Sequence, residues 1–128
     1  MGATQASAGI LAPYIEAHTG GPLLDLTLRG LDRFGPFIER LVDGGASPIG
    51  YRRSGTLDVA LGDETMRRLE RSALTLAGRG VRAELVDGRG ACALEPNLTK
   101  DVVGGLLIHL HGFVGAADLT RALIGAAL

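Results

Sequence analysis

The spacing of apolar residues changes near residue 49, and this change limits the class of fold. Before it, apolar side chains recur at steps of three, four and seven residues, as on one face of a helix: Leu24, Leu28, Leu31, Ile38 and Leu41. Pro22 suits the first turn of this helix, which is expected to run to about Val42. From residue 49 the pattern becomes an alternation, and Leu57 and Val59 predict a half-buried strand. The chain is therefore expected to combine helices with strands.

The second half of the chain repeats both patterns in shorter segments. Asp63 is expected to cap a helix that carries Met66, Leu69 and Leu76 and stops near residues 78–80. Strands are predicted over 81–86 and 102–110, one helical turn over 91–94, and a helix from residue 116 to the last residue. Residues 14–21 are expected to form a connection without regular structure.

Composition limits the classes of function. A chain of 128 residues suits one domain. Its 13 basic and 14 acidic residues give a net charge of −1 without a long block of either sign, so neither nucleic acid nor an anionic membrane is an expected partner. Cys92 is the single cysteine, which fits a reducing compartment, and we expect a cytoplasmic protein without a membrane span.

The N-terminal stretch from Ala3 to Pro13 is unusually poor in bulky side chains. It places one glycine, Gly9, among alanines and short hydroxyl residues before an apolar pair and a proline. Such a run cannot fill a core, but it lets backbone N–H and C=O groups come close to a flat ligand. A frayed N-terminal arm is the alternative interpretation of the same composition.

The segment Ala6-Ser7-Ala8-Gly9-Ile10-Leu11-Ala12-Pro13 resembles the flavin-embracing loop of the FAD-dependent D-amino acid oxidase superfamily, with Ile10 in place of the usual Met. Three further segments match the family in the same order: Tyr51-Arg52 with Gly55-Thr56-Leu57, then Leu94-Glu95-Pro96, then Gly104-Gly105-Leu106-Leu107. The spacing most resembles bacterial glycine oxidases of thiamine biosynthesis. In place of the family's Val-Asp-Pro the chain has Val114-Gly115-Ala116, which puts the geometry of the substrate domain in doubt.

The resemblance implies an α+β fold in which helices pack on a mostly antiparallel sheet. It also implies an FAD cofactor, with flavin-contacting residues in the N-terminal loop: Thr4, Ser7, Ala8, Gly9, Ile10 and Leu11. Glu16 corresponds to an acidic residue near the substrate entrance of such enzymes. We expect residues 1–21 to form the flavin-contacting loop and its connection, and residues 22–128 a partial FAD and substrate domain.

The same resemblance implies that the chain corresponds to the middle of an enzyme. The family's N-terminal Rossmann unit would precede Met1, and its substrate-binding Arg and Tyr would follow Leu128. We therefore expect unknown catalytic residues beyond Leu128 and an inactive chain when it is isolated. The intact enzyme would oxidise glycine or a small D-amino acid to an imine, with peroxide as the second product.

Two alternatives to this function remain open. One is a catalytically inactive fragment or a small α+β interaction module, whose uncovered apolar faces favour self-association. The other keeps the superfamily but makes the substrate sarcosine or another amine, with oxygen or another acceptor reoxidising the flavin. Residues outside the chain would decide between these substrates.

Two other patterns were weighed as sites. Residues 88–93 fit Gly-x-Gly-x-x-Ala after a predicted strand, but Pro96 leaves no room for the long helix that a dinucleotide fingerprint requires. His109 and His111 are two residues apart on a predicted strand, so their side chains are expected to share a face. Because no third ligand is evident near them, no metal site is expected.

Overall fold

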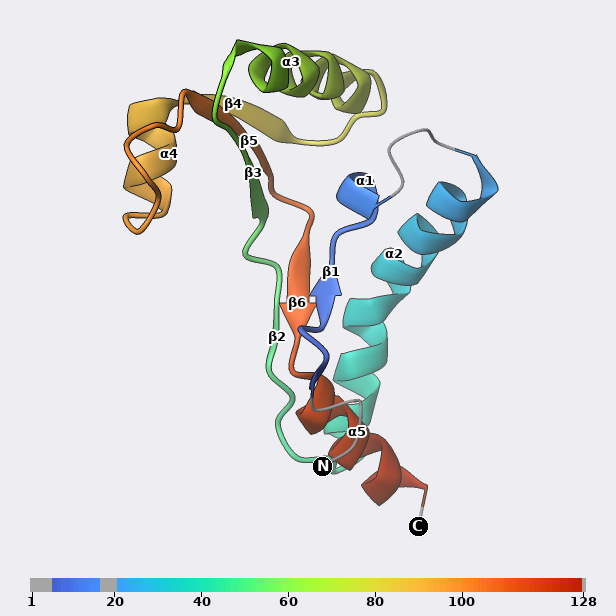
Figure 1. Ribbon diagram of the computed structural model, residues 1–128. Coiled ribbons are helices and arrows are strands. Elements are labelled where there is room, and N and C mark those ends of the chain that lie inside the picture. The colour runs from blue at the N-terminus through green and yellow to red at the C-terminus, as the bar shows by residue number, and fades with distance from the viewer. Residues whose placement is uncertain (1–5, 17–20, 128) are drawn as a thin grey trace. The chain divides into compact units, whose positions relative to one another are not determined.

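The computed structural model describes residues 6–16 and 21–127 (Figure 1). Its backbone contacts divide the chain into two compact units, Met1–Arg53 with Gly112–Leu128, and Ser54–His111. We call these the terminal unit and the central unit and describe each by itself. The sequence suggested a different division, between residues 1–21 and 22–128, which was based on expected contact with a flavin and not on backbone contacts. That division stays a prediction.

The long helix of the terminal unit, α2, spans Pro22–Asp43 and confirms the predicted helix. Its buried side chains are Leu24, Leu31 and Ile38, spaced seven residues apart on one face. The helix is continuous through Pro36, although a proline there cannot donate a backbone hydrogen bond. At its end, the N–H groups of Gly45 and Ala46 donate to the carbonyls of Val42 and Leu41, as in a Schellman motif.

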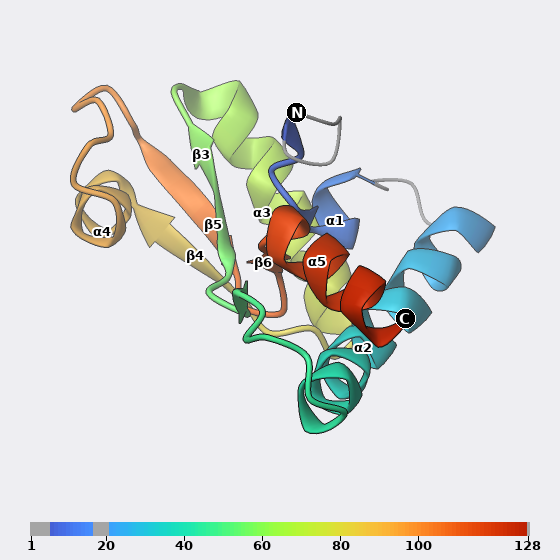
Figure 2. The ribbon, with the colours of Figure 1, turned by 90° about the horizontal axis from the view of Figure 1, so that it is seen from below.

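A small antiparallel sheet accompanies α2 in the terminal unit. Its strand order is β1-β6-β2, with β1 at Ile10–Leu11, β6 at Gly112–Val114 and β2 at Tyr51–Arg52. These strands have two or three residues each, too few for the alternation of side chains that reveals a strand in a sequence. Two helices complete the unit: α5, Ala116–Ala126, which confirms the expected C-terminal helix, and α1, Pro13–Glu16. Figures 1 and 2 show α5 beside α2, in agreement with their contacts.

The short helix α1 corrects one expectation. Residues 14–16 were predicted to lack regular structure, yet they belong to a helical turn that begins at Pro13. Proline is favoured in the first turn of a helix because its missing N–H would have no partner there. The N–H of Ile15 donates to the carbonyl of Ala12, which closes the turn.

The central unit contains the sheet that the alternating pattern predicted. Strands β3 (Thr56–Ala60), β5 (Gly104–Ile108) and β4 (Ala83–Asp87) pair antiparallel in the order β3-β5-β4. Register places Asp58 and Leu85 on either side of Leu106, so the three side chains share one face. Helix α3, Asp63–Gly78, covers this face, where Leu69 and Leu106 are fully buried (Figure 1).

Helix starts in the central unit differ from the sequence expectation. Asp63 is the first helical residue of α3, and Gly62 is the N-cap, without a side-chain hydrogen bond. By contrast, Asp87 caps α4, Gly88–Leu94, because its Oδ1 accepts from the N–H of Gly90 at 2.7 Å. α4 therefore starts three residues earlier than the turn predicted over 91–94. It ends before Glu95-Pro96. With seven residues it is too short for the long helix that a dinucleotide fingerprint requires.

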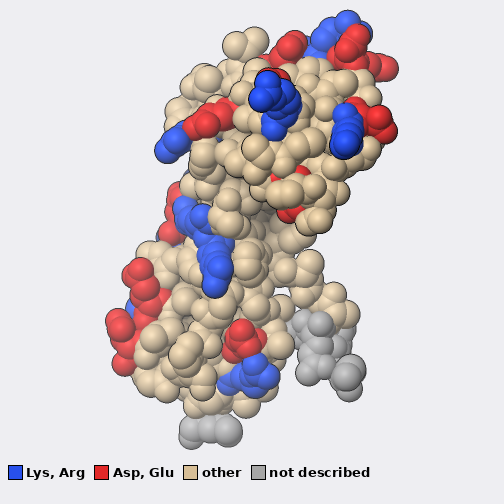
Figure 3. Space-filling view, turned by 90° about the vertical axis from the view of Figure 1, so that its left-hand side faces the viewer, with Lys and Arg blue, Asp and Glu red and all other residues tan. Residues whose placement is uncertain are grey.

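The surface of the described residues carries acidic and basic groups in mixture. Acidic and basic side chains alternate on the face shown in Figure 3, in keeping with the near-balance of charge in the sequence. None of the helices formed by the described residues is both long and apolar enough to span a membrane.

Candidate functional site

The described part of the N-terminal loop is exposed just before β1. Ser7 and Ala8 are exposed and lie outside any helix or strand, and Ile10 is 64% exposed. Ala8 has no hydrogen-bond partner among the described residues. Thr4 lies outside the described residues, so its expected contact with a flavin stays a prediction. The loop thus presents small side chains and open backbone on its outer side.

Gly9 has a structural role that the sequence did not reveal. Its φ angle is 64°, and a Cβ atom at this position would lie 1.9 Å from the carbonyl oxygen of Val114. The carbonyl of Gly9 accepts from the N–H of Val114 at 2.9 Å, and its own N–H donates to Ser7 Oγ at 3.2 Å. The missing side chain at Gly9 therefore makes room for β6. The N–H and C=O of Gly9 both have hydrogen-bond partners within the chain, so they are not free to bind a flavin. A close approach of its backbone to a flavin stays a prediction.

Ile10 and its register place backbone groups at the open edge of the sheet. Ile10 is opposite Phe113 in the antiparallel ladder. Because the Val114 N–H donates to the Gly9 carbonyl, Ile10 and Phe113 form a non-hydrogen-bonded pair. The N–H and C=O of Ile10 consequently point away from β6, at the edge where β1 pairs with no other strand of the described residues. This arrangement fits a flat, polar-edged ring such as a flavin, because nothing bulky on Ser7 or Ala8 would keep it away.

An apolar hollow of about 300 Å³ lies beside the loop. Its lining residues come from β1, α1 and α2: Ile10, Leu11, Ala12, Pro13, Thr27, Gly30, Leu31 and Phe34. The sequence did not indicate that α2 would line this hollow, because its apolar spacing predicted only a helix packed against the rest of the fold. The available signal was Gly30, a glycine inside a helical pattern, since such glycines weaken a helix and often have a packing or binding reason.

Glu16, the expected substrate-entrance residue, is the last residue of α1. The helix fixes its backbone at the end of the turn that follows the loop, at the limit of the described residues. Its side chain is outside what the structure describes, so its role at an entrance stays a prediction.

An aromatic and arginine cluster holds β2 against α2. The rings of Phe34 and Tyr51 have centroids 5.6 Å apart, and Phe34 meets Phe37 edge-on at 6.4 Å. Arg53 donates from Nε to Tyr51 Oη and from Nη2 to the carbonyl of Leu31, each at 2.8 Å. The pair Arg52-Arg53 had no role assigned from the sequence, and Arg53 proves to be structural.

The two histidines of the described residues have separate partners. His111 is completely buried, and its Nδ1 lies 2.7 Å from Thr56 Oγ1. Burial lowers the pKa of His111 to about 4, so the ring is neutral at pH 7. His109 instead meets Glu84, with Nε2 2.9 Å from Oε1. The pair does not form one ligand set, and the described residues contain no cluster of three or more groups able to hold a metal ion.

Glu84 is the centre of an exposed polar cluster on the central unit. Hydrogen bonds from Arg82 first and from His109 second lower the pKa of its carboxyl group. Arg82 Nη2 lies 2.9 Å from Glu84 Oε1. Because the cluster is exposed to solvent, its contribution to stability is expected to be small.

Comparisons with known proteins identify the family of the chain. The DAO family of FAD dependent oxidoreductases matches residues 1–128. The bifunctional protein ThiO/ThiG of Synechocystis sp. is 30% identical over 125 residues, which are 98% of this chain and 17% of that protein. The match to the family extends over the whole chain, so the chain belongs to the DAO family, whose cofactor is FAD.

Solved structures of three oxidases share this fold. Glycine oxidase from Geobacillus kaustophilus superposes with a TM-score of 0.88 at 30% identity, over 98% of this chain and 34% of that one. Glycine oxidase from Bacillus cereus gives 0.82 at 24% identity, over 98% and 33%. Iminodiacetate oxidase from Chelativorans sp. gives 0.75 at 26% identity, over 98% and 34%. The chain spans about one third of the length of these enzymes.

Proposed function

We propose that this member of the FAD dependent oxidoreductase family provides the flavin-contacting third of an oxidase that acts on glycine or a small D-amino acid. The observation that carries the proposal is the loop before β1, where Ser7 and Ala8 are exposed and the backbone of Ile10 faces an open sheet edge. The 30% identity to the Geobacillus kaustophilus glycine oxidase supports the choice of substrate.

In this proposal the chain binds and orients, and the cofactor supplies the redox chemistry. FAD, when bound, would supply the two-electron oxidation of the amino acid to an imine, with oxygen as the final acceptor of two electrons and two protons to give hydrogen peroxide. Thr4, Ser7, Ala8, Gly9, Ile10 and Leu11 would hold the flavin ring.

The backbone of Ser7 and Ala8 would lie against the face of the ring. Ile10 would offer its N–H and C=O at the edge of the sheet. Gly9 would also support the site from below, because its contact with Val114 fixes the loop on β6. Glu16, at the end of α1, would stand near the substrate entrance, where a carboxylate favours an ammonium group.

An oxidase of a secondary amine is the second candidate. The likeness to iminodiacetate oxidase, at 26% identity over 98% of the chain, favours it. Both candidates use the same flavin loop and differ in the substrate. A direct comparison of glycine with iminodiacetate and sarcosine as substrates therefore separates them.

The test is a chimera in which this chain replaces the matching third of the Geobacillus kaustophilus glycine oxidase. We expect the purified chimera to carry flavin and to release peroxide when glycine is added. Circular dichroism identifies a chimera that is folded. A folded chimera that binds no FAD would overturn the proposal, whereas flavin without glycine oxidation would move it to the amine substrates.

A loop variant assigns the effect to the exposed residues. Ala8→Phe places a large ring on an exposed position outside any helix or strand, so we expect a bound ligand to resist it more than the fold does. We expect FAD affinity to fall roughly tenfold to a hundredfold, in line with a strain of about 1–3 kcal/mol in the bound state. Ala77→Phe, on the exposed end of α3, is the matched control and should leave the affinity unchanged. Equal flavin binding by both variants would remove Ala8 from the site.

A further inference from the structure

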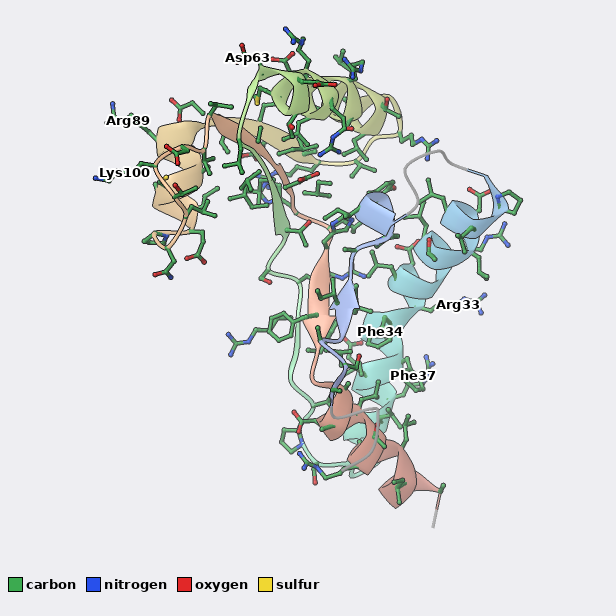
Figure 4. All side chains as sticks on the ribbon, in the orientation of Figure 1. Arg33, Phe34, Phe37, Asp63, Arg89 and Lys100 are labelled. Atoms are coloured by element: carbon green, nitrogen blue, oxygen red, sulfur yellow. The ribbon has the colours of Figure 1, made fainter. Side chains whose placement is uncertain are left out.

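We draw no further inference here: the strongest candidate, the surface hollow of about 390 Å³ at the start of α4 that is lined by Arg89, Cys92 and Lys100 (Figure 4), carries no proposal, because the carboxylate of Asp87 lines it beside the two cations and nothing in the described part of the chain shows which ligand would occupy it.

Discussion

The two sheets of this chain have the same number of strands but are stabilised in different ways. The sheet β3-β5-β4 of the central unit has five residues in every strand, and α3 buries one of its faces. The sheet β1-β6-β2 of the terminal unit has strands of two or three residues. Packing against α3 stabilises the first sheet, whereas the second combines close backbone contacts at β6 with the side-chain cluster of Phe34, Tyr51 and Arg53 at β2.

Glycines mark the difference at β6. A Cβ atom at Gly9 would lie 1.9 Å from the Val114 carbonyl oxygen, and one at Gly112 would lie 2.0 Å from that of Arg52. The central unit also has close glycine contacts, since a Cβ atom at Gly104 would lie 2.8 Å from the Val86 carbonyl oxygen. Its sheet is covered in addition by α3, and Leu69 and Leu106 fill the space between helix and sheet and are fully buried. The small sheet therefore depends on the absence of side chains at Gly9 and Gly112, and the N-terminal loop is attached to this sheet.

The largest expected effect comes from Gly9→Ala, which tests the backbone contacts of the small sheet. The methyl group would meet the Val114 carbonyl, and alanine is strained at a φ of 64°. We expect the free energy of unfolding to fall by about 4 kcal/mol. Both tyrosines of the chain, Tyr14 and Tyr51, lie in the terminal unit and there is no tryptophan, so tyrosine fluorescence in urea reports this unit.

Gly30→Ala is the control for this variant. It adds the same methyl group in open space on a helix and should raise stability by about 1 kcal/mol. Similar urea midpoints for the two alanine variants would show that the small sheet tolerates side chains, and the contrast between the sheets would fail.

A cavity in the central unit should have the next largest effect. Leu106→Ala removes a fully buried side chain from the middle strand of the large sheet, at a cost of about 3 kcal/mol. Circular dichroism should show the loss. Tyrosine fluorescence should keep its midpoint if the units unfold separately, and a joint shift of both signals would show that they unfold together.

The sequence predicted the parts of the fold that side-chain periodicity governs. The alternation around Leu57 and Val59 and the helical spacing of Met66, Leu69 and Leu76 found the large sheet and its covering helix. The small sheet was missed because two or three residues per strand carry no period. Its register is fixed by Gly9 and Gly112, whose backbone approaches depend on partners distant in the chain.

The same limit applies to the candidate site. The small-residue loop was recognised from composition and family resemblance, but the physical reason first assigned to Gly9 was incomplete, since β6 occupies the space that its missing side chain leaves. Thr27, Gly30 and Phe34 were not assigned to the hollow because their contribution depends on how α2 packs beside β1. Packing of this kind cannot be read from local spacing.

The buried His111 gives the central unit a pH dependence of intermediate size. Burial lowers its pKa from 6.5 to about 4, so the unfolded chain binds more protons between these values. The contribution of the neutral His111 to the free energy of unfolding is fully present above the unfolded pKa. It falls as pH decreases toward 4, by roughly 2 kcal/mol between pH 7 and about pH 5. Urea midpoints at the two pH values measure the slope.

Two substitutions assign this slope to one histidine. His111→Asn should flatten it, because asparagine does not titrate in this range. His109→Asn should retain it, since His109 lies at the surface beside Glu84. The assignment to the buried ring is wrong if both variants keep the slope.

The smallest expected effect compares two aspartates at helix starts within the central unit. Asp87 Oδ1 accepts the N–H of Gly90 at 2.7 Å, so Asp87→Ala should remove a cap bond and cost about 1 kcal/mol. Asp63, at the start of α3, makes no cap bond, and Asp63→Ala should cost only about 0.5 kcal/mol through the helix dipole. Asp87→Asn keeps an acceptor oxygen and should recover most of the loss. Circular dichroism in urea measures all three variants. If Asp63→Ala cost as much as Asp87→Ala, the cap hydrogen bond of Asp87 would not distinguish these two helix starts. Side chains would then contribute less to the stability of the central unit than the comparison of the two sheets requires.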